Sequence, residues 1–228
     1  FGMSAYRDLD LSLYPSMPEL WRSLMNIPQD ADVASLAYGA IYSSYGALTL
    51  AALALSMGSA SIAGEERDGT LGLLLGNPKS RTYVLASKAA SMVLLTGLGA
   101  LALWGAGRAA PALLDVNVAG MEVEAFVFHM SVNALFYGFL AMAIGAWTGS
   151  RGLASGATAG LMVVSLFAAG LFPLVEGWES AAKAFPWYYF ISSDPVVNGV
   201  HWGHTAVLLG GCAVFGLAAV RGVNRRDL

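Results

Sequence analysis

The chain alternates between long uncharged stretches and short charged ones. The uncharged stretches span residues 33–64, 89–107, 125–150, 152–175 and 195–220. A helix needs about 20 apolar residues to cross the roughly 30 Å hydrocarbon core of a membrane, and each stretch reaches about that length. The pattern therefore predicts five membrane-spanning helices, near residues 37–63, 87–107, 126–148, 152–174 and 203–220. Strands of a membrane β-barrel would be shorter and would alternate in polarity, so a barrel is not expected.

The charged and polar segments divide the chain into regions. Residues 1–32 carry charges and prolines throughout, so they are expected to form an external N-terminal segment that does not cross the membrane. Within it, the sequence from Pro18 to Met25 predicts a short helix. Residues 33–228 form the predicted transmembrane domain, with a connector at 64–86 and an external helical segment at 176–200. The fold class expected is an all-α, polytopic membrane helical bundle.

Small residues are dense in the first and fourth predicted spans. Gly58 and Ser59 mark the first, and Gly156 and Gly160 mark the fourth. In lipid, helices gain little from hydrophobic attraction to one another, and small side chains let their backbones approach closely. These positions are therefore predicted to lie where helices pack against one another.

The segment from Ile62 to Lys88, between the first two spans, has the densest charge in the chain. It holds seven of the 27 formal charges, namely Glu65, Glu66, Arg67, Asp68, Lys79, Arg81 and Lys88. Because charge is costly in hydrocarbon, this segment must lie at a membrane surface. Leu71, Leu74 and Leu75 recur at the spacing of one helix face. Such an amphipathic helix either lies in the lipid interface or docks on a partner protein.

Composition and charge agree with a membrane protein. Hydrophobic residues make up 57% of the chain and charged residues 12%, about half the charged share of soluble domains. The net charge of −3 argues against a nucleic-acid partner. Cys212 is the only cysteine, which leaves no disulfide framework within the sequence and no cysteine-based metal site.

Lysine and arginine predict the orientation. If the connector is cytoplasmic, eight of the 12 basic residues lie inside and four outside, whereas four acidic residues lie inside and 11 outside. The positive-inside rule then places the connector and the C-terminus in the cytoplasm of a multi-pass protein of the cell membrane. A chain that starts in the cytoplasm would need one more span before Phe1, so six spans are expected in the full protein.

The connector resembles the cytoplasmic connector of type-2 ABC exporter permeases. The residues that carry the resemblance are Gly64-Glu65-Glu66-Arg67-Asp68-Gly69-Thr70-Leu71, Leu74-Leu75, Asn77-Pro78, Ser80-Arg81 and Lys88. Asp68, Gly72 and Gly76 depart from the commoner form, and each glycine costs a helix about 1 kcal/mol relative to alanine. A weaker resemblance continues through Trp187-Tyr188-Tyr189-Phe190, Asp194-Pro195 and the C-terminal Arg225-Arg226-Asp227-Leu228.

The resemblance implies a function. In that family the connector is a coupling helix that docks on a separate ABC ATPase subunit, and two permease copies or homologous halves enclose the translocation path. The chain would then be the permease subunit of an ATP-driven exporter of an amphipathic or lipophilic substrate, such as a drug, an antibiotic or a lipid-like molecule. It would have no catalytic residue and no cofactor, and ATP and magnesium would bind the partner. The expected contacts with the ATPase subunit are Glu65, Glu66, Arg67, Thr70, Leu71, Leu74, Leu75, Pro78, Ser80 and Arg81.

The connector sequence also has local signals for helix ends. Pro78 is expected to end the amphipathic helix, because proline lacks a backbone donor. Ser80 is a favourable residue to cap the next helix, which leads past Lys88 into the second span.

Other polar residues are candidates for the translocation path or an external gate. Tyr42 and Tyr45 in the first span, and Asn133 and Tyr137 in the third, each form a polar pair at helical spacing. They either line the path or hydrogen-bond between helices. The aromatic run Trp187, Tyr188 and Tyr189 either gates the exit or, with Trp178, anchors the protein in an aromatic belt at the membrane surface.

Two alternative functions are open to the sequence. An intramembrane protease of the paired-glutamate type needs glutamates and histidines facing one another within the membrane. Glu65 and Glu66 lie at the cytoplasmic end of a span, whereas His129, His201 and His204 are expected near the other face, and no metal site is expected among them. There is no Gly-x-x-x-x-Gly-Lys-Ser/Thr loop for ATP. The second alternative is a membrane anchor or assembly subunit that does not transport.

Overall fold

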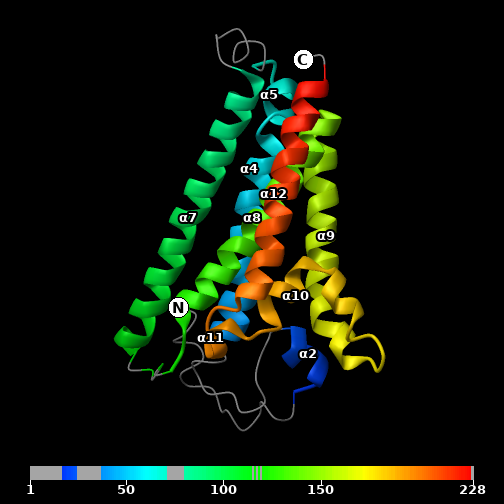
Figure 1. The fold of residues 1–228 in the computed structure, drawn as a ribbon. Coiled ribbons are helices and arrows are strands. Elements are labelled where there is room, and N and C mark those ends of the chain that lie inside the picture. Colours follow the sequence, from blue (N-terminus) through cyan, green and yellow to red (C-terminus); the bar gives the residue numbers. More distant parts are fainter. Residues whose placement is uncertain are drawn as a thin grey trace.

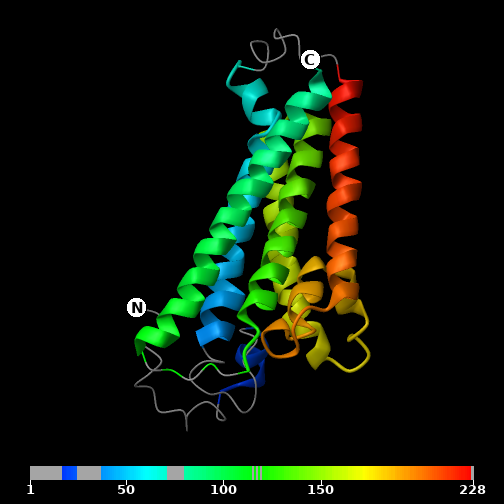
Figure 2. The same cartoon turned by 60° about the vertical axis from the view of Figure 1, so that its left-hand side comes forward.

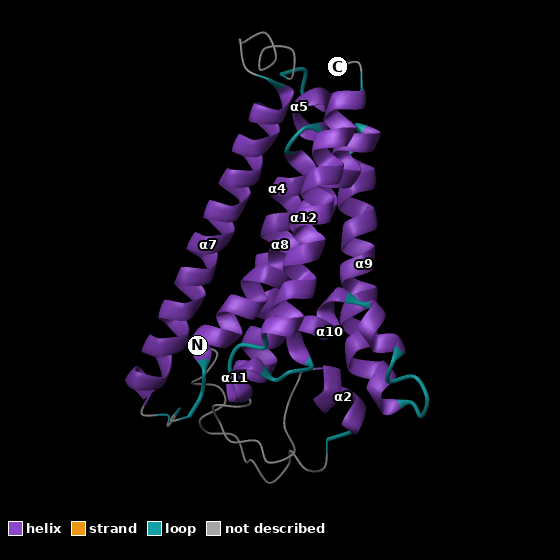
Figure 3. Cartoon of the chain, in the orientation of Figure 1, coloured by secondary structure: helices purple, strands orange, loops and turns teal. Residues whose placement is uncertain are grey.

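The computed structural model describes residues 17–24, 37–70, 80–114, 116, 118 and 120–226. Figure 3 shows this part of the chain as helices joined by loops and turns, which confirms the all-α class. The elements are α2 (Glu19–Leu24), η2 (Ala37–Gly46), α4 (Ala47–Ala60), α5 (Ala63–Arg67), α7 (Arg81–Leu114), α8 (Val123–Thr148), α9 (Arg151–Leu171), η3 (Phe172–Leu174), η4 (Ala181–Ala184), α10 (Pro186–Ile191), α11 (Pro195–Asn198) and α12 (Trp202–Arg225).

Four helices in the described ranges are long and apolar enough to cross a membrane. They cover Arg81–Leu113, Val123–Thr148, Arg151–Leu174 and Trp202–Arg225. The first predicted span is built differently, because the π-helix η2 runs directly into α4 through the helical backbone of Gly46. The helices thus lie at the five uncharged stretches, while the points at which they enter and leave the membrane stay predictions.

Helix α7, which forms the second predicted span, extends beyond its predicted range at both ends. It starts at Arg81, where the Ser80 hydroxyl accepts a hydrogen bond from the Tyr83 N–H at 3.1 Å. The predicted cap is therefore confirmed. At the other end, α7 continues through Pro111 to Leu114. Long basic side chains can reach water from the end of an apolar helix. The charged residues that bounded the predicted span therefore did not have to end α7. The short helix predicted near Trp21 is also present, as α2.

The long helices run alternately up and down, which sorts the connecting segments into two groups. One end of the bundle, here called the connector end, holds α5, the turn between α8 and α9, and the end of α12 (Figure 1). The opposite end holds α2, α10 and α11 (Figures 1 and 2). The predicted external segment at 176–200 lies at this opposite end and contains three short helices, η4, α10 and α11.

Helix α8 lies in the centre of the bundle and contacts α4, α7, α9 and α12. Its closest neighbour is α4, because glycine on both helices lets the backbones nearly touch. A methyl group at Gly58 would lie 2.0 Å from the carbonyl oxygen of Gly138. No side chain fits into that distance, so glycine at position 58 is needed for this crossing.

Two of the small residues of α9 do not play the predicted role within the described part of this chain. Gly156 and Gly160 are exposed, and a methyl group at either would meet no neighbouring helix in the described part of the chain. The buried face of α9 is formed instead by Ala154, Thr158, Met162, Ser165, Ala168, Ala169 and Gly170, most of which are also small. Density of small residues does not by itself tell which face of a helix is covered, and helix packing through Gly156 and Gly160 stays a prediction.

Candidate functional site

The connector begins with a tight turn after α4. The Ser61 hydroxyl donates to the Gly58 carbonyl at 2.7 Å, and Ala63 and Gly64 are buried as α5 starts. These contacts fix α5 against the end of α4. Glu65 and Glu66 lie in the first turn of α5, and Arg67 ends it.

Glu65 joins the connector to α7. Its Oε1 accepts a hydrogen bond from Lys88 Nζ on α7, and its Oε2 accepts one from the Thr70 hydroxyl. The Thr70 N–H also donates to the Glu65 carbonyl, at 2.9 Å. The bonds from Lys88 and Thr70 hold the pKa of Glu65 below its usual range, because both stabilise the carboxylate.

Glu66 joins the connector to the end of α12. Its Oε1 accepts a hydrogen bond from Arg226 Nη2 at 2.7 Å, and both side chains are only partly exposed. The guanidinium of Arg226 lies against Gly149, where a methyl group would sit 2.3 Å from Nη2. Gly149 has a φ of +66°, which also favours glycine. The turn after α8 is thus shaped to admit the arginine.

Arg81 completes this junction from the start of α7. Its Nη1 donates to the Arg226 carbonyl at 2.5 Å and the Val223 carbonyl at 3.4 Å. Cationic side chains at the C-terminus of a helix satisfy carbonyls that have no partner within the helix. The connector, the start of α7, the turn after α8 and the end of α12 therefore meet in one polar cluster, which we call the connector cluster: Glu65, Glu66, Thr70, Arg81, Lys88, Gly149 and Arg226.

Two further charges of the connector, Arg67 and Asp68, face away from the bundle, and Lys79 lies outside the described residues. Arg67 Nε and Asp68 Oδ1 pair with each other at 2.9 Å, and both side chains are more than half exposed. The predicted contact set is thus divided. Arg67 is available to a partner, whereas Glu65, Glu66 and Arg81 are turned toward the protein's own helices. Leu71, Leu74, Leu75 and Pro78 lie outside the described residues, so the amphipathic helix stays a prediction.

The structure places the four candidate path residues in two different settings. Tyr42 donates a hydrogen bond to the Leu103 carbonyl of α7 at 3.2 Å, and Tyr45 is exposed. Both line a hollow of about 240 Å³ beside Leu103. Asn133 and Tyr137 are fully buried in α8, and within the described residues their polar side-chain atoms have no hydrogen-bond partner. Tyr42 thus forms the hydrogen bond between helices that was one of its two expected roles. A role in transport stays a prediction for all four residues.

The aromatic run of α10 is partly internal. Trp187 is fully buried against Tyr137 and Phe190, and its backbone N–H donates to the Ser165 hydroxyl at 2.9 Å. Its position rules out a place in an aromatic belt at the lipid surface, whereas Trp178 is half exposed. The sequence alone could not tell the buried Trp187 from the half-exposed Trp178, because α10 is short and its packing depends on the neighbouring helices. A role in gating stays a prediction for Trp187, Tyr188 and Tyr189.

The glutamates and the histidines lie at opposite ends of the molecule. At the end opposite the connector, His129 Nε2 accepts a hydrogen bond from the backbone N–H of His201 at 3.1 Å. The ring centroids of His201 and His204 lie 4.0 Å apart. Glu65 and Glu66 belong to α5 at the connector end (Figure 1). The facing arrangement that a paired-glutamate protease requires is therefore not formed.

Fold and site together define a polytopic helical membrane protein. Its charged connector follows α4 directly and is bonded to α7 and to the end of α12. The family model described as ABC-2 family transporter protein matches residues 4–192, and the chain belongs to that family. It is thus a permease subunit of an ABC transporter and a multi-pass membrane protein, and its family implies a separate ABC ATPase as partner. The chain matches no curated protein and no solved structure.

Proposed function

We propose that the chain forms the transmembrane half of an ATP-driven exporter whose coupling element is the connector. The observation that carries the proposal is the connector cluster. Glu65 is bonded to Lys88 on α7, and Glu66 is bonded to Arg226 at the end of α12. A force applied to the connector by a partner therefore reaches two long helices directly, rather than being lost in a loose loop.

In this proposal the ATPase subunit binds the outward side of the connector. Leu71, Leu74 and Leu75, if helical, form an apolar face that fits a groove on the partner, and Arg67 and Asp68 lie exposed beside it. ATP and magnesium bind the ATPase subunit. A second copy of this chain, or a homologous half, completes the translocation path.

The connector end is the cytoplasmic side in this proposal. The described basic residues at this end are Arg67, Arg81, Lys88, Arg151, Arg221, Arg225 and Arg226, and Lys79 of the same connector lies outside the described residues. An excess of lysine and arginine in short loops favours retention in the cytoplasm of the cell membrane. The opposite end, with α2, α10 and α11, is then external.

The cargo class follows from the scarcity of charge within the spans. Tyr42, Tyr45, Asn133 and Tyr137 supply hydroxyl and amide groups but no ionised group. A path of that chemistry suits an amphipathic or lipophilic compound, such as a drug, an antibiotic or a lipid-like molecule. A strongly charged solute would lose its hydration without compensation.

The test replaces two leucines of the predicted docking face. A Leu74→Asp/Leu75→Asp double variant should insert normally, because its spans are unchanged, but should lose the ATPase subunit or lose cargo-stimulated ATP hydrolysis. Leu→Ala at a buried site typically costs about 2–5 kcal/mol, and a buried charge is worse. Leu73→Asp is the matched control, since Leu73 would lie on the other side of the same helix. Co-purification in detergent and ATPase assays with and without cargo measure both effects.

Two results would refute the coupling role. If the double variant co-purifies and transports like the parent, the connector is an interfacial helix. If Leu73→Asp is equally damaging, the face predicted from the leucine spacing is wrong. A non-transporting anchor is distinguished by the parent protein itself, which would bind the ATPase subunit but show no cargo-stimulated hydrolysis and no flux.

A further inference from the structure

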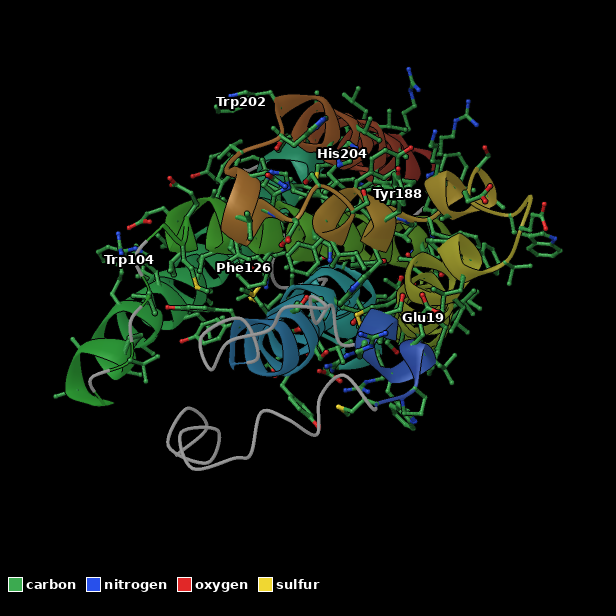
Figure 4. The ribbon with its side chains drawn as sticks, turned by 90° about the horizontal axis from the view of Figure 1, so that it is seen from below. Glu19, Trp104, Phe126, Tyr188, Trp202 and His204 are labelled. Atoms are coloured by element: carbon green, nitrogen blue, oxygen red, sulfur yellow. The ribbon has the colours of Figure 1, made fainter. Side chains whose placement is uncertain are left out.

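The opposite end of the molecule contains a pocket that none of the preceding functions uses. It has a volume of about 570 Å³ and lies where α2 packs beside α9 and α10. Figure 4 looks onto this end, with Glu19 marking α2 and Tyr188 marking α10. The volume falls within the range of about 300–1,000 Å³ that is typical of small-ligand sites.

The pocket is lined by charges of both signs. Arg22 of α2 and Lys183 of η4 supply the positive charges, and Glu179 and Asp194 supply the negative ones. The four ion pairs found among the described residues involve none of these four side chains. In addition, Nε of Arg22 is buried and has no hydrogen-bond partner in that part of the chain. A buried donor without a partner is unfavourable, and a ligand oxygen would satisfy it.

The remaining lining is mixed, with Ser23, Ser180, Ser192 and Tyr188 beside an apolar part. Ala169 of α9 and Pro173 of η3 contribute there, together with Ile191 of α10. The segment Arg151–Leu174 is long and apolar enough to cross a membrane, so the pocket opens close to the level at which that helix would leave the hydrocarbon. A molecule with a polar head in the pocket could extend its apolar part along α9.

The charge pattern selects the ligand class. A simple anion would be repelled by Glu179 and Asp194, and a simple cation by Arg22 and Lys183. An uncharged apolar molecule would strip water from all four charges without replacing it. A ligand that carries both a phosphate and an ammonium group satisfies both sets. Guanidinium groups bind phosphate oxygens with good geometry, and carboxylates accept hydrogen bonds from ammonium.

We propose that this pocket binds the zwitterionic head group of a phospholipid that carries a primary amine. Its phosphate bonds to Arg22 and Lys183, and its ammonium group bonds to Glu179 and Asp194. Burial raises the pKa of Asp194, and a bound ammonium group would oppose this shift by stabilising the carboxylate. A lipid held here need not be the exported compound, so this site stands independently of the exporter proposal.

Lipid retention by the purified full chain tests the site. The protein in detergent is mixed with equal amounts of phosphatidylethanolamine and phosphatidylglycerol of the same acyl chains, and native mass spectrometry counts the lipids bound. The parent should retain phosphatidylethanolamine with a preference of about fivefold or more. Phosphatidylglycerol shares the phosphate but has no amine, so the comparison isolates the carboxylates.

Variants separate the two halves of the pocket. Arg22→Gln should weaken both lipids, because both carry the phosphate, whereas Asp194→Asn should abolish the preference for the amine. Asp194 has a φ of +45°, and asparagine tolerates this conformation, so the backbone is preserved. Glu176→Gln is the matched control, because Glu176 is an exposed acid of the same segment outside the pocket. Each variant is checked for an unchanged melting temperature.

The outcomes are decisive in both directions. No preference in the parent, or a full preference in Asp194→Asn, overturns the proposal. Loss of preference in Asp194→Asn but not in Glu176→Gln supports it. A competition arm with excess soluble phosphoethanolamine then identifies the source, since displacement shows recognition of the free head group and retention shows that the acyl chains contribute.

Discussion

Glu65 is the residue at which the charge chemistry of the connector can be measured. Lys88 and Thr70 stabilise its carboxylate, so its pKa in the folded protein lies below that in the unfolded chain. Such a group adds stability that is fully present above the unfolded pKa and is lost as the pH falls through the folded pKa. The effect therefore belongs to neutral and mildly acidic conditions and disappears in strong acid.

A Glu65→Gln variant should be less stable than the parent at pH 7, by up to about 1 kcal/mol for a pair that is partly exposed. The difference should shrink as the pH is lowered below the usual range for glutamate. Thermal unfolding in detergent across this range measures it. Asp68→Asn is the control, because Asp68 pairs with its exposed neighbour Arg67 and should show little change. Equal stability of parent and Glu65→Gln at pH 7 would mean that the pair contributes nothing.

Single residues in and around the connector cluster differ in how far the sequence could predict their contacts. Ser80 could be predicted as a cap because the bond it makes spans only three positions. The Glu66–Arg226 pair joins residues 160 positions apart, and no local pattern connects them. The sequence pointed to both as charged residues at span ends. Their pairing follows only from the way α12 returns to the connector end.

At the scale of helices, the lengths of the apolar runs predicted where the helices lie. They did not predict which face of each helix packs against its neighbours. The described part of each uncharged stretch is mainly helical, because hydrocarbon requires every backbone group to be bonded within the segment. Which side of a helix is covered depends on its neighbours. For this reason packing through Gly156 and Gly160 of α9 stays a prediction, whereas Gly58 of α4 does lie at a helix crossing.

The crossing of α4 and α8 gives a prediction at this scale. Gly58→Ala should destabilise the protein by about 1–3 kcal/mol, the usual cost of overpacking a filled core, because its methyl group would meet the Gly138 carbonyl oxygen. Gly156→Ala adds the same group where the described part of this chain has no atom within 4 Å. It should be neutral or slightly stabilising, since alanine favours a helix by up to about 1 kcal/mol over glycine. Melting temperatures and the yield of monodisperse protein compare the two. Similar behaviour of both variants would show that the backbones can separate without cost.

At the scale of the whole molecule, the grouping of segments at two ends follows from counting crossings. Each long helix runs antiparallel to the one before it. The connector, the turn at 149–150 and the end of α12 must therefore lie at the same end of the bundle. The structure shows this arrangement (Figure 1). The course of the chain therefore brings Glu65, Glu66 and Arg226 to one level, and packing against α8 then sets their distances.

Which end faces the cytoplasm is a separate question, and labelling can answer it. In a Cys212→Ala background, Asp68→Cys and Ala184→Cys place one thiol at each end of the bundle, both at exposed positions. An impermeant maleimide added to intact cells should label Ala184→Cys and leave Asp68→Cys unlabelled, because eight of the 12 basic residues favour a cytoplasmic connector. Permeabilised cells should label both, which controls for accessibility. Labelling of Asp68→Cys alone in intact cells would place the connector outside. A cytoplasmic ATPase could not then reach Leu74 and Leu75, so the same result would also remove the coupling role proposed for them.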